Sequence, residues 1–287
     1  MPNLYSPQPL TLLVLGYADS GKSWLAADWS RLLAELNGDP DGKQTTIIFD
    51  LEDGYKALAP KARILRTPAG DSRKTADTVV KALAALRGKG ALVVVDGLSE
   101  QELETLGRLR KEGKTDREDE LKPSWEAWND LLVLFVQMAQ AAKHSGLHFL
   151  CTARVDTARD PADPLDEDKS VYVPGVRGKF GRWASHYFDA VAYMEEDTDR
   201  GVHRLWFRTP LKARWRTRNR WRHLMADGKR IIPVYLEWRS GKEQHIKAAD
   251  VLDVIKKAQE AAAMEAVAAD SPADSTGSLE ERGKLDA

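Results

Sequence analysis

The chain has 287 residues, of which 43% are hydrophobic and 30% are charged, and its formal net charge is −1. This length allows one large α/β domain or two small ones, and the composition is that of an ordinary globular protein. It contains no apolar run of about 18 residues and no signal peptide, which argues against a membrane or secreted protein. The single cysteine, Cys151, excludes an internal disulfide and a cysteine-based zinc site. We therefore expect a cytoplasmic protein.

A phosphate-binding loop is the first motif along the chain. The segment "LTLLVLGYADSGKS" matches G-x-x-x-x-G-K-[ST], between an apolar run that predicts a buried parallel strand and apolar residues at helical spacing. Backbone N–H groups at the start of such a helix bind phosphates. We expect Lys22 to bridge the β- and γ-phosphates of ATP and Ser23 to hold Mg²⁺. The expected nucleotide contacts are Gly16, Asp19, Ser20, Gly21, Lys22, Ser23 and Trp24.

Acidic residues follow the second predicted strand. Residues 45–49 are β-branched, aromatic or apolar, and "DLEDG" lies at their carboxyl end. Ligands of α/β sheets bind outside the carboxyl ends of the strands, so Asp50, Glu52 and Asp53 should face the phosphate loop. Glu52 is our candidate general base for the attacking water. The alternative interpretation makes these acids turn and helix caps.

Two further strands are expected to end at the same site. Residues 91–95 form an apolar run that ends in Asp96, a Walker B arrangement in which the carboxylate holds Mg²⁺ together with Ser23. A fourth strand, 147–157, follows an amphipathic helix over 125–143. Near its end, Thr152 and Arg154 either sense the γ-phosphate or make local hydrogen bonds. These β-α repeats predict a mostly parallel, twisted sheet with helices on both faces.

A basic segment comes after the last of these strands. "KARWRTRNRWR" carries an arginine at every second position from 214 to 222, so a strand would place them on one face. Lys212 and Arg214 could stabilise the transferring phosphoryl group of a neighbouring subunit. Alternatively, the row binds nucleic-acid phosphates or is solvated surface. The candidate DNA contacts, which include the loop "VPGVRGKFGRW", are Arg177, Lys179, Arg182, Arg216, Arg218 and Arg220.

The C-terminal region divides into two parts. Apolar residues at helical spacing predict a C-terminal helix, assigned to 241–265, that packs either on the core or on a neighbouring subunit. The last residues, 266–287, lean acidic and lack large side chains, which predicts a disordered tail. The expected division is thus a core over 1–240, this helix and the tail.

Several segments, taken together, resemble a known family. "GYADSGKS", "TTIIFDLEDGYKAL", "ALVVVDGLSE", "HFLCTARVD" and "LKARWRTRN" resemble the RecA-like class of P-loop ATPases. Within that class they are similar to bacteriophage nucleotide-binding proteins with an AAA ATPase domain, including Sak-type single-strand annealing ATPases. The resemblance spans residues 10–222. It implies that Glu52 is the catalytic glutamate, Asp96 the Walker B aspartate and Thr152 a polar γ-phosphate sensor, and that Lys212 and Arg214 reach the ATP of a neighbour in a ring or filament.

The resemblance also implies a biological role. Segments 99–124 and 156–183 fall where RecA-like proteins carry DNA-facing loops, although both are rich in acid here. The implied function is DNA-stimulated ATP hydrolysis in phage recombination, single-strand annealing or replication, with Mg²⁺ as cofactor. Single-stranded DNA and a single-stranded-DNA-binding protein are the implied partners. The alternatives are a helicase-like motor or helicase loader, a small-molecule phosphotransferase on the same loop, and a nucleotide-dependent scaffold.

Overall fold

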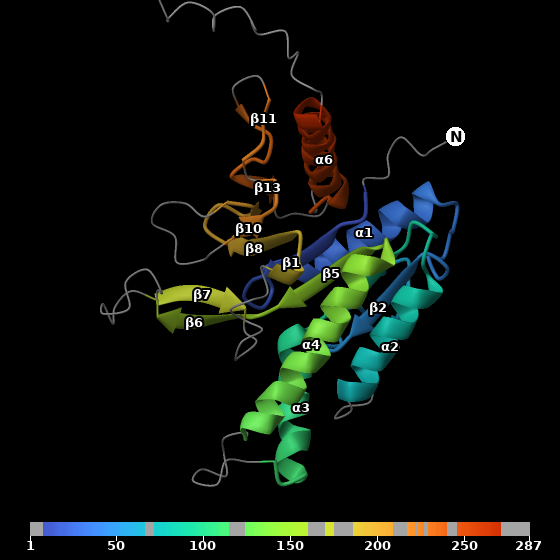
Figure 1. The fold of residues 1–287 in the computed structure, drawn as a ribbon, viewed down its shortest axis with the longest axis vertical. Helices are drawn as coiled ribbons and strands as arrows, with labels where there is room; N and C mark the ends of the chain where they lie inside the picture. The colour runs from blue at the N-terminus through green and yellow to red at the C-terminus, as the bar shows by residue number, and fades with distance from the viewer. Residues whose placement is uncertain are drawn as a thin grey trace, which may run out of the picture.

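The computed structural model describes residues 8–66, 72–114, 124–159, 170–174, 186–208, 217–221, 223–226, 229–239 and 246–270. Within these residues, nine strands form one sheet in the order β13-β9-β8-β1-β5-β4-β2-β3, with β10 beside β8 (Figure 1). These strands are β1 (Thr11–Leu15), β2 (Thr46–Asp50), β3 (Arg63–Leu65), β4 (Leu92–Asp96), β5 (His148–Ala153), β8 (Ala190–Asp197), β9 (Val202–Trp206), β10 (Arg218–Asn219) and β13 (Tyr235–Arg239).

Most of the sheet is parallel. Strands β3, β2, β4, β5, β1 and β8 run in one direction, whereas β9, β10 and β13 pair antiparallel with their neighbours. Every residue of β1, β2, β4 and β5 is buried. Burial on both faces explains why these strands appear in the sequence as continuous apolar runs.

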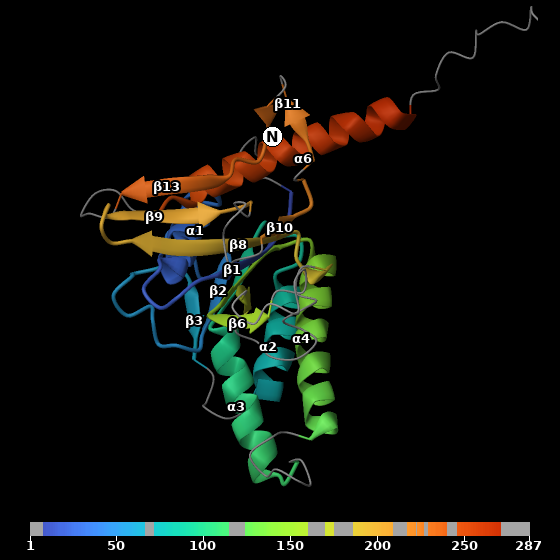
Figure 2. The same cartoon turned by 90° about the vertical axis from the view of Figure 1, so that its left-hand side faces the viewer.

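Helices cover both faces of the sheet (Figures 1 and 2). Alternate side chains of β1 point to opposite faces, with Leu13 in one apolar cluster and Leu12 in the other. The first cluster lies against α2, α3 and α4, and the second against α1 and α6. The sequence predicts an α/β fold with a mostly parallel sheet and helices on both faces, and this prediction is confirmed. The helices are α1 (Lys22–Leu36), α2 (Ser72–Ala85), α3 (Leu98–Lys111), α4 (Trp125–Ser145) and α6 (Ala248–Asp270).

Two segments differ from the sequence-based expectation. The strand predicted over 147–157 is two strands, because β5 ends at Ala153 and β6 (Val155–Arg159) pairs with β7 (Ser170–Pro174) in a separate sheet. The segment 99–124, expected as a loop, begins within α3. Leu106 and Leu109 of that helix are buried in the core, so apolar packing holds these residues in helical form.

The C-terminal helix is shifted relative to its prediction. It begins at Ala248 and continues to Asp270, into residues that were expected to belong to the tail, while 271–287 lie outside the described residues. Its buried residues pack against the apolar face that includes α1, so the helix lies on the core of its own chain. Asp28 of α1 accepts the backbone N–H of Ala248 at 2.8 Å, which caps the start of the helix.

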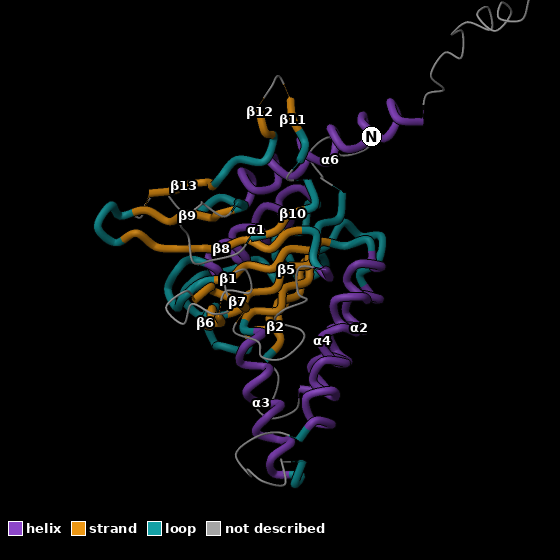
Figure 3. The backbone as a smooth tube through the Cα atoms, turned by 60° about the vertical axis from the view of Figure 1, so that its left-hand side comes forward, coloured by secondary structure: helices purple, strands orange, loops and turns teal. Residues whose placement is uncertain are grey.

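The remaining strands form a hairpin near α6. β11 (Met225–Ala226) pairs with β12 (Lys229–Arg230), and Figure 3 shows this hairpin on the side of the sheet where β13 and α6 lie. Trp221, which precedes it, is buried in the core, so its ring is not available to stack on a nucleic-acid base. Among the described helices, none is long and apolar enough to cross a membrane.

Candidate nucleotide site

The phosphate loop connects β1 to α1 at the carboxyl end of the parallel strands. Gly21 has φ +104°, and a Cβ atom at this position would lie 2.3 Å from Cδ1 of Ile246. A Cβ on Gly16 would lie 2.4 Å from the backbone oxygen of Met194. Gly16 is therefore required by its close approach to a neighbouring backbone, and Gly21 by its left-handed backbone.

Lys22 lies folded over its own loop. The side chain is buried, and its Nζ donates hydrogen bonds to the carbonyl oxygens of Gly16 at 3.0 Å and Tyr17 at 2.5 Å. Burial lowers the pKa of Lys22, and the neighbouring carboxylates of Glu52 and Asp96 oppose that shift only in part. An anion that reached this ammonium group would stabilise its charged form.

A serine and an aspartate meet beside the loop. Ser23 Oγ donates a hydrogen bond of 2.7 Å to Oδ2 of Asp96, and the hydroxyl of Thr152 donates to Oδ1. Burial raises the pKa of Asp96, and both hydrogen bonds oppose the rise. The oxygens of Ser23 and Asp96 are of the type that Mg²⁺ prefers. Within the described part of the chain, no cluster of three or more His, Cys, Asp or Glu is placed to hold a metal.

Thr152 is occupied by local contacts. Besides its bond to Asp96, its Oγ1 accepts the backbone N–H of Gly97 at 3.0 Å, and only 1% of the residue is exposed. This is the geometry of the local alternative, in which the hydroxyl orients Asp96. Contact of Thr152 with a γ-phosphate stays a prediction.

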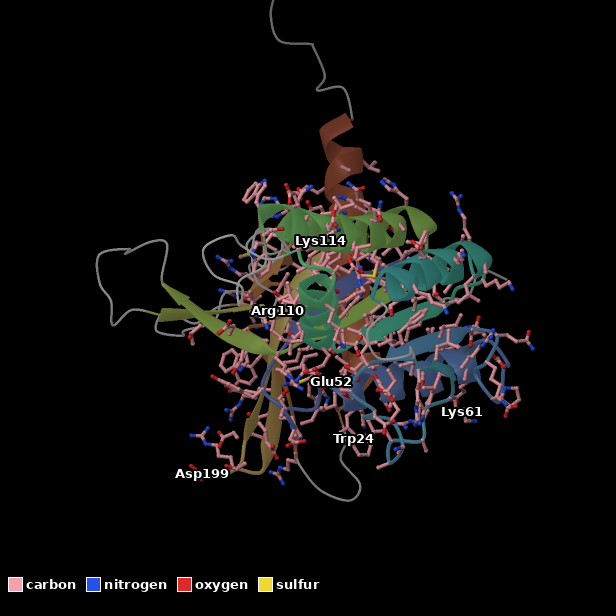
Figure 4. The ribbon with its side chains drawn as sticks, turned by 90° about the horizontal axis from the view of Figure 1, so that it is seen from below. Trp24, Glu52, Lys61, Arg110, Lys114 and Asp199 are labelled. Carbon is pink, nitrogen blue, oxygen red and sulfur yellow. The ribbon has the colours of Figure 1, made fainter. Side chains whose placement is uncertain are left out.

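Of the three acids at the carboxyl end of β2, Glu52 is the one that faces the loop. Its Oε1 lies 3.4 Å from Nε of Arg154, and 29% of its side chain is exposed. Burial raises the pKa of Glu52, the charge of Asp96 raises it further, and Arg154 and Lys22 oppose the rise. Glu52 is labelled in Figure 4, with Trp24 of the first turn of α1 below it in that view. A carboxyl group held in this way has the properties of a candidate base.

The other two acids serve the turn itself. Asp50 accepts the backbone N–H groups of Gly54 at 3.0 Å and Tyr55 at 3.4 Å, which is the capping alternative. Asp53 pairs at the surface with Lys56 and with Arg66, at 2.5 Å and 2.9 Å. The expectation that all three acids face the phosphate loop is therefore wrong for Asp50 and Asp53.

The other loop residues occupy distinct environments. Asp19 adopts a left-handed backbone with φ 60° and is exposed. Ser20 is buried, and its carbonyl oxygen lies 3.1 Å from Nδ1 of His203 in β9. Trp24 is partly buried against the apolar cluster of α1 and α6.

Three residues that contact the candidate site were not identified from the sequence. Gly97 has φ +100°, and a Cβ there would lie 2.8 Å from Cγ of Glu52. Glu100 pairs with Arg154 at 2.5 Å, and His203 contacts the phosphate loop. The glycine directly after Asp96 was the one available signal, because a tight turn after a strand demands such a residue. Glu100 and His203 carry no local signal.

Most of the predicted DNA and neighbour contacts lie outside the described residues. This holds for Arg177, Lys179, Arg182, Lys212, Arg214 and Arg216, and for the side chain of Arg218 in β10.

Arg220 is described and has a structural partner. It pairs with Asp189 at 3.1 Å, and 56% of its side chain is exposed. Asp189 also accepts the backbone N–H and the hydroxyl of Thr11, at 3.0 Å and 2.9 Å. Arg220 therefore helps to fix the segment after β10 against the start of β1.

Comparison with known proteins assigns the family. A family model described as an AAA domain matches residues 8–221, which is more than half of the chain. The chain belongs to the AAA domain family. Membership implies a P-loop ATPase fold that binds a nucleotide, usually with Mg²⁺. No curated protein matches the chain.

Several solved structures are similar to this AAA domain protein at low identity. A DnaB-like replicative helicase is 10% identical with a TM-score of 0.43, over 70% of this chain and 52% of its own. The chain thus spans about half of the length of that helicase. The RadB recombinase is 14% identical with a TM-score of 0.44, over 81% of this chain and 88% of its own. A KaiC-like protein from Pyrococcus horikoshii is 14% identical with a TM-score of 0.44, over 82% and 87%.

Proposed function

We propose that this AAA domain protein binds ATP with Mg²⁺ and hydrolyses it with Glu52 as general base. The observation that carries the proposal is the hydrogen bond of 2.7 Å between Ser23 and Asp96, formed near Lys22 and Glu52 at the carboxyl ends of the parallel strands β1, β4 and β2. A lysine, a hydroxyl and two carboxylates at this position match the requirements of phosphoryl transfer to water.

Each group has one task in this proposal. Lys22 exchanges its two carbonyl partners for phosphate oxygens. The negative charge of the phosphates then stabilises the ammonium group, whose charged form burial disfavours. Ser23 and Asp96 hold Mg²⁺, which when bound neutralises charge on the phosphates. Backbone N–H groups of residues 16–24, among them Asp19, Ser20 and Trp24, surround the phosphates, and Thr152 fixes Asp96.

Glu52 carries the proton transfer. Its carboxylate orients a water molecule and accepts a proton as the water oxygen bonds to the terminal phosphorus and the bond to the leaving oxygen breaks. The raised pKa of Glu52, caused first by burial, makes it a stronger base than an exposed glutamate.

We further propose that the ATPase acts on single-stranded DNA, in recombination, strand annealing or replication, as a ring or filament. Support comes from the basic segments 177–182 and 212–222 in a chain of net charge −1. Lys212 and Arg214 would reach the ATP of a neighbour, and the remaining arginines would contact phosphates. A similar role in phage annealing, with a single-stranded-DNA-binding protein as partner, is part of this proposal. A helicase-like motor is the second candidate for the same core.

The test is ATP hydrolysis by the purified chain with and without single-stranded DNA, at low and raised salt. We expect turnover that Glu52→Gln abolishes while ATP binding persists, and that DNA stimulates in a salt-sensitive way. The matched control is Glu112→Gln, which removes a surface glutamate paired with Arg108. Turnover that needs a phosphate acceptor and ignores DNA would instead identify a phosphotransferase. Strand displacement by a hexamer would identify the helicase.

A further inference from the structure

One guanidinium group connects two carboxylates at the edge of the nucleotide site. Arg154, directly after β5, places Nε 3.4 Å from Oε1 of Glu52 and Nη2 2.5 Å from Oε1 of Glu100. Its backbone N–H donates to Oγ of Ser99 at 3.0 Å. Glu100 lies in the first turn of α3, the helix that follows Asp96. The start of α3 therefore holds Arg154 by both main chain and side chain.

The two oxygens of Glu52 have different surroundings. A Cβ on Gly97 would lie 2.8 Å from Cγ and 3.4 Å from Oε1 of Glu52, so the backbone of Gly97 packs directly against this carboxyl group. The ion pair with Arg154 engages the same oxygen, Oε1. Packing on one side and a cation on one oxygen leave Oε2 as the atom suited to accept a proton.

The charges around Glu52 oppose one another. Asp96 and Glu100 are like charges that raise its pKa, in addition to burial, which is the largest cause. Arg154 and Lys22 are the cations that lower it, and Nζ of Lys22 is turned to the carbonyls of its own loop. Arg154 is half exposed, so its ion pairs contribute little to folding stability. Arg154 instead affects the pKa and the orientation of the Glu52 carboxyl group.

We propose that Arg154 and Glu100 are positioning residues for Glu52, in which Glu100 anchors the guanidinium and the guanidinium fixes Oε1 so that Oε2 faces the reaction. This inference rests on the proposed function, since it assigns a role within the same site. Because Glu100 belongs to α3, the position of α3 determines where Arg154 holds the carboxylate of Glu52. A shift of the first turn of α3 would thereby change hydrolysis.

The first test needs no turnover. The carboxyl carbons of ¹³C-labelled glutamate are titrated by NMR in the full chain, with the Glu52 signal assigned by its loss in Glu52→Gln. Arg154→Ala removes the nearest cation and should shift the Glu52 titration to higher pH. Glu100→Gln frees the guanidinium from its anchor, so the Glu52 titration should move in the same direction, by a smaller amount because a like charge is lost as well. An unchanged titration in Arg154→Ala, or a shift to lower pH in Glu100→Gln, would overturn the proposal.

The second test uses turnover. Arg154→Ala should lower ATP hydrolysis on the order of 10- to 100-fold, as loss of a supporting contact does at other sites, and Arg154→Lys should restore part of it. ATP affinity and thermal unfolding should stay close to those of the wild type. Glu112→Gln, which breaks the 2.7 Å pair with Arg108 at the other end of α3, is the matched control and should change neither readout.

The two levels of failure are distinct. Absence of ATP binding and turnover in the wild type would refute the proposed function, whereas the NMR titration would still measure how Arg154 and Glu100 act on Glu52. Normal turnover with loss in Glu52→Gln but full activity in Arg154→Ala would refute the positioning role alone.

Discussion

Two groups of buried charges lie on the same sheet and are compensated differently. At the carboxyl ends of the parallel strands, burial lowers the pKa of Lys22 and raises those of Glu52 and Asp96, so each charged form is disfavoured. At the antiparallel end, burial lowers the pKa of Arg204, but hydrogen bonds to Glu237 and Asp197 outweigh this and raise it.

The difference separates a site prepared for a ligand from a structural cluster. Arg204 joins three strands, since it pairs with Glu195, Asp197 and Glu237 at 3.4, 3.0 and 2.6 Å. At the nucleotide site, the ion pair of Glu52 with Arg154 and the hydrogen bonds to Asp96 offset burial only in part, and a phosphate with its cation would add to this compensation. Substitutions should therefore affect function at one end and stability at the other.

The largest expected effect is the loss of turnover in Lys22→Met. Removal of the ammonium group should reduce ATP hydrolysis by about 10²- to 10³-fold, because one donor to the transition-state charge is lost. Unfolding in urea should show unchanged or higher stability, since a poorly compensated buried charge disappears. Marked destabilisation of Lys22→Met would contradict the distinction between the nucleotide site and the Arg204 cluster.

A buried histidine should contribute to the decrease of the free energy of unfolding at acidic pH. Burial lowers the pKa of His148, at the start of β5, to about 4. The unfolded chain takes up this proton near pH 6.5, so the stability contribution is present above that pH and is lost as the pH falls toward 4. The loss amounts to about 3 kcal/mol. Urea unfolding between pH 7 and 4 should show a shallower decline in His148→Leu than in the wild type, and equal slopes would refute the assignment.

Arg204→Met tests the antiparallel end. It leaves Glu195, Asp197 and Glu237 without their shared cation, which should cost about 2 kcal/mol, a value reduced by their partial exposure. ATP turnover per folded molecule should stay unchanged. Arg200→Met removes an exposed arginine 3.8 Å from Asp197 in the same hairpin but leaves Arg204 with its three carboxylates, so it serves as the control for loss of one exposed cation. A selective loss of turnover in Arg204→Met would show that the two charge groups are coupled.

The smallest expected effect is that of Gly97→Ala. The left-handed φ of +100° and the 2.8 Å that would separate the new Cβ from Cγ of Glu52 predict a stability loss of about 1 kcal/mol and a drop in turnover of about 10-fold. Gly201→Ala, at φ +59° in an open turn, is the matched control for backbone strain alone. Equal turnover in the two variants would show that Gly97 does not position Glu52.

The sequence by itself determined the elements with a strong local signal. The phosphate loop, the buried strands and the helix 125–143 follow from glycine placement and apolar periodicity, and their bounds agree closely with β1, α1, β2, β4 and α4. These features depend on neighbours a few residues apart, which is the range over which sequence patterns act.

Tertiary structure alone decided which charges meet. Glu100 is 48 residues from Glu52 and 54 from Arg154 in the chain, yet α3 brings them together at the ends of β2 and β5. The three acids at the carboxyl end of β2 lie within four residues of one another, but Asp50 accepts backbone N–H groups of the turn and Asp53 forms ion pairs at the surface. The sequence named Glu52 as the candidate base, but burial and pairing arise from packing across the sheet, so only the fold showed that Asp50 and Asp53 have other partners.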